Sequence, residues 1–445
     1  MQTYSAVTSL MRNKKYLLFV SGAIHFTMLA IIIWKSSPWI TGDSGRYLVL
    51  ATSLTSGEGF GIATINGFEP EGMRAPGYSI FILIVRSVAG NSDFSIILFQ
   101  SLMYLALIWL VWKICRQIFN DECAMIFLLI SALYPFLMYS AGQISPEIPT
   151  AFLLASAVWL LLKPSFGRVL GAAALIAVAA YFRPNLIFLD AVLLTALFIK
   201  NIRDWRKPLL VLVTTIIIVA PFAARNYIVF GKSTPLPVIR GTGNSLMLTY
   251  WMTKISINSL VKYGMYGEVT PEVKDSGMVE QIAEINRKVG VPENTLFVTL
   301  ESYPTNETKM KADELLGEYA VRNIAASPFA YLKTVAKNSV RMWFTSELPD
   351  EYSLKLKLAL WINGIAFALL GACGVVMAFL KRNENNRLII TFLSGVFLYF
   401  IATLSWLHTE ARYTITARAF LLMFAAYAIY EFYKFGKTFV WKNNY

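Results

Sequence analysis

The sequence predicts an all-α polytopic membrane protein, and three observations lead to this fold class. Hydrophobic residues make up 56% of the 445 positions and charged residues only 15%, which is too apolar for an ordinary soluble protein. Apolar segments long enough to cross a bilayer recur along the chain. Basic residues gather in the short loops between these segments, as they do on the cytoplasmic side of membrane proteins.

Apolar windows predict about ten transmembrane helices. They cover residues 16–34, 94–113, 123–140, 147–162, 168–181, 186–200, 207–229, 357–380, 387–406 and 413–434. The apolar run 79–89 is too short to span a bilayer and contains Arg86, so we expect an interfacial helix there.

The distribution of basic residues predicts the orientation. With the N-terminus inside, the loops on that side collect most of the lysines and arginines, whereas the short turns on the other side carry only Arg183 and Arg412. The positive-inside rule therefore favours both termini in the cytoplasm, and we expect a multi-pass protein of the cytoplasmic membrane.

On this topology two long segments, 35–93 and 230–356, lie on the outer side. The second contains apolar residues at helical spacing, interrupted at Pro328, and predicts a small helical outer domain. The chain then divides into three parts. The N-terminal transmembrane module covers 1–229 and includes the first outer loop at 35–93. The outer domain at 230–356 follows, and the C-terminal transmembrane helices lie at 357–445.

Composition excludes several classes of function. The net charge is +13, but the basic residues lie in loops between apolar segments, so we expect membrane lipids and no nucleic acid as partners. Cys115, Cys123 and Cys373 form no CxxC pair and predict neither a disulfide framework nor a zinc site. Because the chain has only two histidines, any metal would be bound mostly by carboxylates.

Ionisable side chains that lipid does not tolerate converge on the outer side of this topology. They are Asp43, Glu69, Glu71, Arg74, Glu147, Arg183, Arg225, His408, Glu410 and Arg412. Placing charged side chains at the depth of the membrane costs free energy, so such residues usually belong to functional sites. We therefore expect a polar site at the outer interface. Carboxylates beside arginines suit a reaction in which one group accepts a proton while others neutralise a phosphate.

Several of these residues also fit purely structural roles. Asp43 suits the N-cap of an interfacial helix. Arg74 stands before an Ala-Pro-Gly turn and fits an interfacial cation, and Glu147 fits the first turn of a helix, where the dipole favours its charge. The later arginines could equally pair with a carboxylate or bind carbonyls. Spacing alone leaves both interpretations open.

Six sequence elements follow one another along the chain. They are GDSGRY with ATSLTSGEGFG, then MRAPGYSIF, SAGQISPEIPTAFLL, YFRPNLIFL, PFAARNYIVFGKSTPL with GTGNSL, and HTEARYTITARAFLL. Their order and spacing resemble the GT-C superfamily of integral membrane glycosyltransferases, in particular protein O-mannosyltransferases and lipid A aminoarabinose transferases. The resemblance covers nearly the whole chain.

The resemblance implies a GT-C fold and an inverting glycosyltransferase. Such an enzyme moves a hexosyl or pentosyl group from a polyprenyl-phosphate donor to an acceptor hydroxyl. The acceptor is a lipid, a glycan or a protein, and transfer takes place at the outer face of the cytoplasmic membrane.

The resemblance also implies roles for individual residues. Asp43 matches the first-loop aspartate that serves as general base in the family. Donor-phosphate binding falls to Arg74, Arg183, Arg225 and Arg412. Support or acceptor positioning falls to Glu147, Tyr47 and Glu410.

One departure from the aminoarabinose transferases bears on metal binding. In those enzymes a glutamate directly precedes the basic residue of the first loop and helps to hold a metal, whereas here Met73 stands in that position. Candidate ligands for a possible divalent metal ion are Glu69 and Glu71, with His408 as a distant partner.

Two other functions compete with this hypothesis. A transporter or flippase of lipid-linked sugars also needs buried charges beside a groove, but predicts charges near the bilayer midplane and repeat symmetry between the halves. No internal repeat is visible in the sequence. A polymerase or ligase that takes a diphosphate-linked glycan would need a more extensive basic site than the arginines of this sequence provide.

Overall fold

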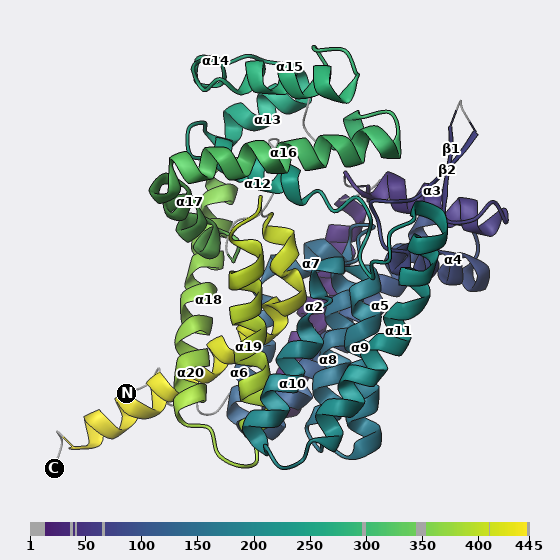
Figure 1. Ribbon diagram of the computed structural model, residues 1–445. Helices are drawn as coiled ribbons and strands as arrows, with labels where there is room; N and C mark the ends of the chain where they lie inside the picture. The colour runs from purple at the N-terminus through teal and green to yellow at the C-terminus, as the bar shows by residue number, and fades with distance from the viewer. Residues whose placement is uncertain are drawn as a thin grey trace.

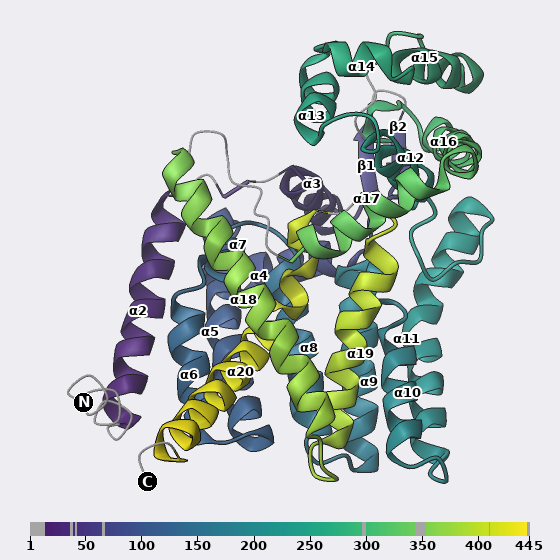
Figure 2. The same cartoon turned by 90° about the vertical axis from the view of Figure 1, so that its left-hand side faces the viewer.

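The computed structural model describes residues 14–35, 39–40, 42–64, 67–295, 300–343, 353–408 and 410–442. These residues form two layers (Figure 1). One layer is a bundle of long apolar helices, and the other is a cap of helices within residues 242–341 that covers one end of the bundle. The first described helix begins, and the last ends, on the side of the bundle away from the cap (Figure 2).

A helix or a bent helix pair forms at each of the ten predicted windows. The bundle helices are α2 (Lys14–Lys35), α5 (Asp93–Ile118), α6 (Asp121–Ala132), α7 (Pro135–Ala141), α8 (Glu147–Leu161), α9 (Phe166–Phe182), α10 (Leu189–Lys200), α11 (Arg206–Phe230), α18 (Leu354–Leu380), α19 (Arg387–Leu404) and α20 (Ile415–Lys442). Within the described residues, six helices are long and apolar enough to cross a membrane, or seven if the bent α6–α7 pair is one span. The prediction of an all-α, multi-pass membrane protein is confirmed, while ten spans stays a prediction.

Helix α20 lies at the centre of the bundle. In the span Ala411–Gly436, which contains most of α20, 78% of an apolar 18-residue window is buried, against 22% of such a window in α18, which packs along α20. Glycines make this close packing possible: a Cβ added to Gly374 of α18 would lie 1.9 Å from the Phe424 carbonyl oxygen of α20. Any side chain at Gly374 would therefore push the two helices apart.

The loop between α2 and α5 folds against the cap end of the bundle. It contains α3 (Ser44–Thr55), the antiparallel strands β1 (Gly61–Thr64) and β2 (Gly67–Pro70), and α4 (Gly77–Ala89). Helix α4 forms where the interfacial helix was predicted. The small hairpin was not predicted, because its strands have only four residues each and carry two glycines.

The cap has a small hydrophobic core of its own. Its helices are α12 (Thr242–Trp251), α13 (Ile257–Tyr266), α14 (Pro271–Asp275), α15 (Met278–Val289), the 3₁₀ turn η2 (Leu300–Ser302), α16 (Asn306–Ala326) and α17 (Pro328–Arg341). Trp251, Ile282 and Leu316 are among the residues buried between them. The cap lies in the segment predicted as a helical outer domain; the junction at 344–352 is outside the described residues.

Polar contacts fasten the cap to the first loop. The backbone N–H of Asn306 donates to the Glu69 carboxylate, and its side-chain amide donates to the Pro70 carbonyl at 2.7 Å. Lys309 lies 3.6 Å from the same glutamate. The backbone N–H of Ile239 donates to the Gly72 carbonyl at 2.9 Å. The loop that follows β2 is thereby held between the cap and the bundle.

We predict that Gly374→Ala destabilises the protein by about 1–3 kcal/mol, because the added methyl group overpacks the contact between α18 and α20. The thermal unfolding midpoint in detergent measures this effect. Gly22→Ala in α2 is the matched control, since a Cβ at Gly22 meets no atom within 4 Å. Equal midpoints for the two variants would contradict the predicted packing.

Candidate active site

Asp43 stands at the start of α3, at the cap end of the bundle. It occupies the N-cap position, but its side chain makes no capping hydrogen bond. Its carboxylate instead lies between two arginines from distant segments: Oδ1 is 2.7 Å from Arg74 Nη2 and Oδ2 is 2.8 Å from Arg412 Nη2. The Asp43 side chain therefore forms ion pairs with two arginines and does not cap the helix.

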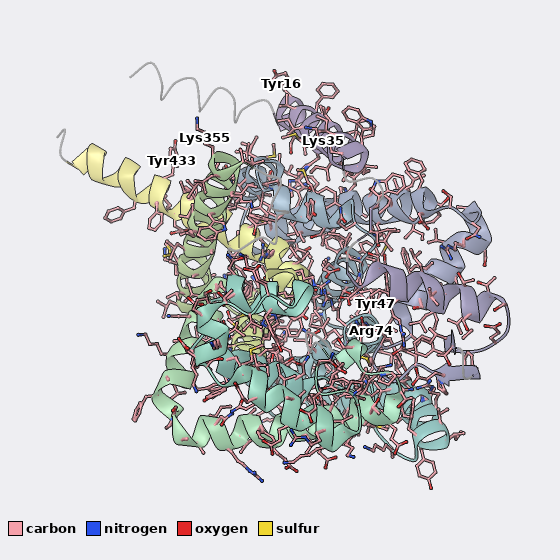
Figure 3. The ribbon with its side chains drawn as sticks, turned by 90° about the horizontal axis from the view of Figure 1, so that it is seen from above. Tyr16, Lys35, Tyr47, Arg74, Lys355 and Tyr433 are labelled. Carbon is pink, nitrogen blue, oxygen red and sulfur yellow. The ribbon has the colours of Figure 1, made fainter. Side chains whose placement is uncertain are left out.

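Arg74 reaches Asp43 from the loop between β2 and α4. The same Nη2 atom lies 2.8 Å from Glu301 Oε1, which the η2 turn of the cap supplies. Its Nε atom is buried and has no hydrogen-bond partner among the described residues. Figure 3, seen from the cap side, shows Arg74 beside Tyr47 of α3. Tyr47 is buried and packs edge-on against Tyr78.

Arg412 approaches from the opposite side of Asp43, on the 3₁₀ turn η3 (Ala411–Thr414) that precedes α20. Its Nε donates to the carboxylate of Glu410. Its guanidinium group also lies 5.7 Å from the ring centre of Tyr413. The turn between α19 and α20 thus contributes a cation and its own counter-ion.

A second ion pair, between Glu147 and Arg183, lies next to this group. Glu147 begins α8 and is 2% exposed, and it accepts a hydrogen bond from Arg183, which ends α9. The Arg183 guanidinium lies 5.0 Å from the centre of the Tyr413 ring, which Arg412 also contacts. Arg183 Nε and Glu147 Oε2 are buried without a partner among the described residues.

Six of the sequence-predicted residues therefore come together at the cap end of the bundle. We call them the rim cluster: Asp43, Arg74, Glu147, Arg183, Glu410 and Arg412. Burial alone would raise the pKa of Asp43, but the charges of Arg74, Arg412 and Arg183 outweigh burial and hold this pKa below its ordinary value of 3.8. Asp43 is therefore ionised at neutral pH.

Glu71 sets the conformation of the loop that carries Arg74. The carboxylate of Glu71 is fully buried. Oε1 accepts hydrogen bonds from the backbone N–H of Met73 at 2.6 Å and of Arg74 at 3.0 Å. Oε2 pairs with Arg46 Nε at 2.6 Å, so α3 and this loop share one carboxylate.

Gly77, in the MRAPGY element, allows α4 to approach the end of α9. An added Cβ would lie 2.6 Å from the carbonyl carbon of Tyr181. Because Arg74 lies just before this contact and Arg183 just after it, the glycine brings the two arginines to one place.

Arg418 anchors the turn that carries Arg412. It is 1% exposed within α20, and its guanidinium donates to the carbonyl oxygens of Met342 and Ala411 at 3.0 and 2.9 Å. It also donates to the hydroxyls of Thr414 and Tyr134 at 3.0 and 3.1 Å. Burying a cation without a carboxylate among its contacts costs free energy. The hydrogen bonds of Arg418 connect the η3 turn to the end of α17.

Arg225 is not part of the rim cluster, although it was predicted to bind donor phosphate. It lies near the C-terminal end of α11 and donates to the Phe60 carbonyl at 3.2 Å and to Asn226 at 3.0 Å. Its guanidinium also packs over the rings of Phe60 and Phe230. These contacts hold the first loop against α11.

The residues predicted as metal ligands do not fit a metal site. Glu69 binds Asn306 and Lys309 in the cap, Glu71 binds Arg46 and two backbone amides, and neither has a free pair of oxygens. In the described part of the chain, no three His, Cys, Asp or Glu side chains are grouped closely enough to hold a metal ion.

His408 lies near Glu410, whose charge acts on its imidazole. Its backbone N–H donates to the Ser245 carbonyl of the cap at 3.1 Å. Burial lowers the pKa of its imidazole, while the charge of Glu410 acts in the opposite direction. The ring is therefore neutral at pH 7.

Sequence reasoning missed Glu301, Arg46 and Arg418 as parts of this site. Arg418 belongs to the HTEARYTITARAFLL element, and a lone arginine inside an apolar helix was a signal that could have found it. Glu301 lies in a stretch without a recognisable motif, so only its contact with Arg74 reveals it.

The chain is similar to a protein family and to solved structures. A family model described as dolichyl-phosphate-mannose-protein mannosyltransferase matches residues 73–224, about a third of the chain. A crystal structure of an oligosaccharyltransferase from Archaeoglobus fulgidus, in complex with Zn and sulfate, has a TM-score of 0.51 and 13% identity over 94% of this chain and 49% of that chain. The crystal structure of ArnT from Cupriavidus metallidurans, bound to undecaprenyl phosphate, has a TM-score of 0.41 and 15% identity over 88% of this chain and 76% of that chain.

The chain thus spans about half the length of the archaeal protein and about three quarters of that of ArnT. A search of curated protein sequences gave no match. The archaeal structure shows a shared fold, and the family model adds similarity to a glycosyltransferase family over the segment that carries Arg74, Glu147 and Arg183. The resemblance to GT-C membrane glycosyltransferases that the six sequence elements indicated is confirmed.

We predict that Glu147→Leu destabilises the protein by about 3–5 kcal/mol, because it leaves the Arg183 cation buried without its carboxylate. The double variant Glu147→Leu/Arg183→Leu should recover most of the loss, since it removes both charges. Thermal unfolding midpoints of wild type, both single variants and the double variant give the coupling between the two residues. Additive effects of the two single substitutions would contradict a buried ion pair.

Proposed function

We propose that this protein is an inverting glycosyltransferase that moves a sugar from a polyprenyl-phosphate donor to an acceptor hydroxyl, with Asp43 as general base. The match of residues 73–224 to a family of dolichyl-phosphate-mannose-dependent enzymes supports the class of donor. The observation that carries the proposal is that both oxygens of one carboxylate contact guanidinium groups, from Arg74 and Arg412, which also suit a phosphate.

Donor binding would exchange these ion pairs. A phosphodiester is an anion that accepts bidentate hydrogen bonds from arginine, so it competes with Asp43 and Glu301 for Arg74. The unpartnered Nε atoms of Arg74 and Arg183 are further donors for phosphate oxygens. As the arginines turn towards the phosphate, Asp43 loses their positive field, and its pKa rises towards that of a useful base.

The chemical step is a single displacement at the anomeric carbon. The acceptor oxygen attacks that carbon from the face opposite the phosphate, and its proton passes to the Asp43 carboxylate. The bond between the anomeric carbon and the phosphate oxygen breaks, and polyprenyl phosphate leaves with the electron pair. Arg74, Arg412 and Arg183 stabilise the charge that develops on this phosphate, and one displacement inverts the configuration.

We further propose that the rim cluster faces the outer side of the cytoplasmic membrane and that both termini are cytoplasmic. By the positive-inside rule, the basic residues in the loops on the side of the N-terminus support this orientation, and the described ends of the chain lie away from the cap (Figures 1 and 2). The proposed division is a transmembrane module at 1–229, an outer domain at 230–356 and transmembrane helices at 357–445. A prenyl chain in the bilayer then reaches the cluster without leaving the lipid.

We predict that Asp43→Asn lowers sugar transfer by at least about 10²–10⁴-fold, the usual contribution of a general base, while donor binding persists. Purified protein is incubated with radiolabelled hexosyl and pentosyl polyprenyl monophosphates and membrane extract, and label leaving the donor is counted. Asp93→Asn is the control, because Asp93 pairs with Arg86 outside the cluster.

Two outcomes would overturn this assignment. Equal release of label by wild type and Asp43→Asn would exclude Asp43 as the base. If wild type releases no label from any donor but moves labelled donor across a vesicle membrane, the protein is a transporter of lipid-linked sugars instead.

The pH dependence of kcat/KM gives a separate prediction. A general base is active only when deprotonated, so activity is present above its pKa and is lost as the pH falls through that pKa. Because the Asp43 pKa lies below 3.8 in the free protein, the loss of activity due to Asp43 lies below pH 4. Arg412→Gln removes one stabilising cation and should move this acid limb to higher pH. An acid limb that stays in place in Arg412→Gln would contradict the role of Asp43.

A further inference from the structure

The ring of Tyr413 contacts two arginines of the rim cluster that come from different parts of the chain. Its centre lies 5.0 Å from the guanidinium group of Arg183, at the end of α9. The guanidinium group of Arg412, which precedes Tyr413 on η3, lies 5.7 Å from the same ring. No sequence-based prediction and no step of the proposed reaction assigns a role to this tyrosine.

Arg183 and Arg412 repel each other. Burial and the positive charge of Arg412 both lower the pKa of Arg183, so the two guanidinium groups are close enough to interact. In the resting site, Glu147 pairs with Arg183 and Asp43 pairs with Arg412. In the proposed reaction, Arg412 turns from Asp43 towards the donor phosphate. The two cations then need a contact that holds them together and does not compete with the phosphate.

An aromatic ring provides such a contact. The face of an aromatic ring carries negative potential and attracts cations, although the ring has no net charge. A carboxylate in the same place would neutralise the arginines and compete with a phosphate for their N–H groups. A ring therefore attracts two guanidinium groups while the site keeps its positive charge for an anion.

Packing and hydrogen bonds hold the Tyr413 ring in position. The ring packs against the hydrophobic core of the bundle, and the backbone N–H of Tyr413 donates to the Glu410 carbonyl at 3.1 Å. The next residue, Thr414, is fully buried, and its hydroxyl donates to the Met342 carbonyl at 2.7 Å. The backbone around the ring is thus tied to the fold. The ring therefore offers a fixed platform to the two longer arginine side chains.

We propose that Tyr413 is a positioning residue for the donor phosphate, and that its ring holds the guanidinium groups of Arg183 and Arg412 together as one anion site. This inference rests on the proposed glycosyltransferase function and adds to it the residue that joins these two arginines. In this role Tyr413 acts through the arginines and not on the reacting atoms. Weakening the negative face of the ring therefore weakens donor binding more than it slows the chemical step.

A series of substitutions that keep the shape of the ring tests this role without depending on activity. Tyr413→Phe removes only the hydroxyl, and mono-, di- and trifluorinated phenylalanine at position 413 then weaken the negative potential of the ring face step by step. Farnesyl phosphate, a short polyprenyl monophosphate, is titrated calorimetrically into the full chain in phosphatidylcholine nanodiscs. We expect Tyr413→Phe to bind within about twofold of wild type, and the trifluorinated variant about tenfold more weakly.

Two controls show whether the effect passes through the arginine pair. The same series at Tyr319, whose ring lies 5.1 Å from the Lys288 ammonium group in the cap, should leave farnesyl phosphate binding as in wild type. In an Arg412→Gln background, the series at Tyr413 should change the affinity by less than about threefold, because only one arginine of the pair remains to be held.

Three binding results would overturn the role of Tyr413. An affinity that stays constant along the fluorinated series would mean that the ring face does not hold the arginines. A loss that is already complete in Tyr413→Phe would mean that the hydroxyl, and not the ring face, serves the phosphate. An equal loss along the series in the Arg412→Gln background would mean that the ring does not act on the pair.

An activity experiment separates this inference from the function on which it rests. With a donor that wild type uses, the trifluorinated variant at position 413 should raise the KM for the donor about tenfold and change kcat less than KM. An unchanged donor KM in this variant overturns the role of Tyr413 alone, whereas failure of wild type to transfer sugar from any donor overturns the glycosyltransferase.

Discussion

The rest of the site depends on the pairing of one carboxylate, Asp43, with the guanidinium groups of Arg74 and Arg412. Ion pairs at a partly buried interface contribute little net stability, because desolvation offsets most of the attraction between the charges. The proposed function explains their retention by exchange: a donor phosphate that binds the arginines would release the carboxylate.

Structural residues outside the cluster place each member of it. Buried Glu71 fixes the backbone of Arg74, Gly77 lets α4 approach α9, and Arg418 holds the turn of Arg412 with four hydrogen bonds to neutral groups. The cap adds Glu301 to Arg74 and is itself fastened to the first loop through Glu69. The site is therefore assembled from the loop, the bundle and the cap together.

The fold could be predicted because length and apolarity decide which segments form membrane helices. Convergence of Asp43, Arg74, Arg183 and Arg412 follows from the alternating directions of those helices, which bring the segments that carry these residues to the same end of the bundle. Spacing does not say where a loop side chain points, so Glu71 was a candidate ligand for a possible metal ion, whereas in the structure it binds Arg46 and backbone amides. Glu301 and the hairpin at β1 and β2 carried no sequence signal of comparable strength.

The most direct test of the central claim is a cryo-electron microscopy structure of the full chain with a polyprenyl monophosphate bound in a nanodisc. The account predicts the phosphate within hydrogen-bond distance of Arg74 and Arg412, with the Asp43 carboxylate released from both and facing an open acceptor position. A phosphate bound elsewhere, with both ion pairs of Asp43 intact, would contradict it.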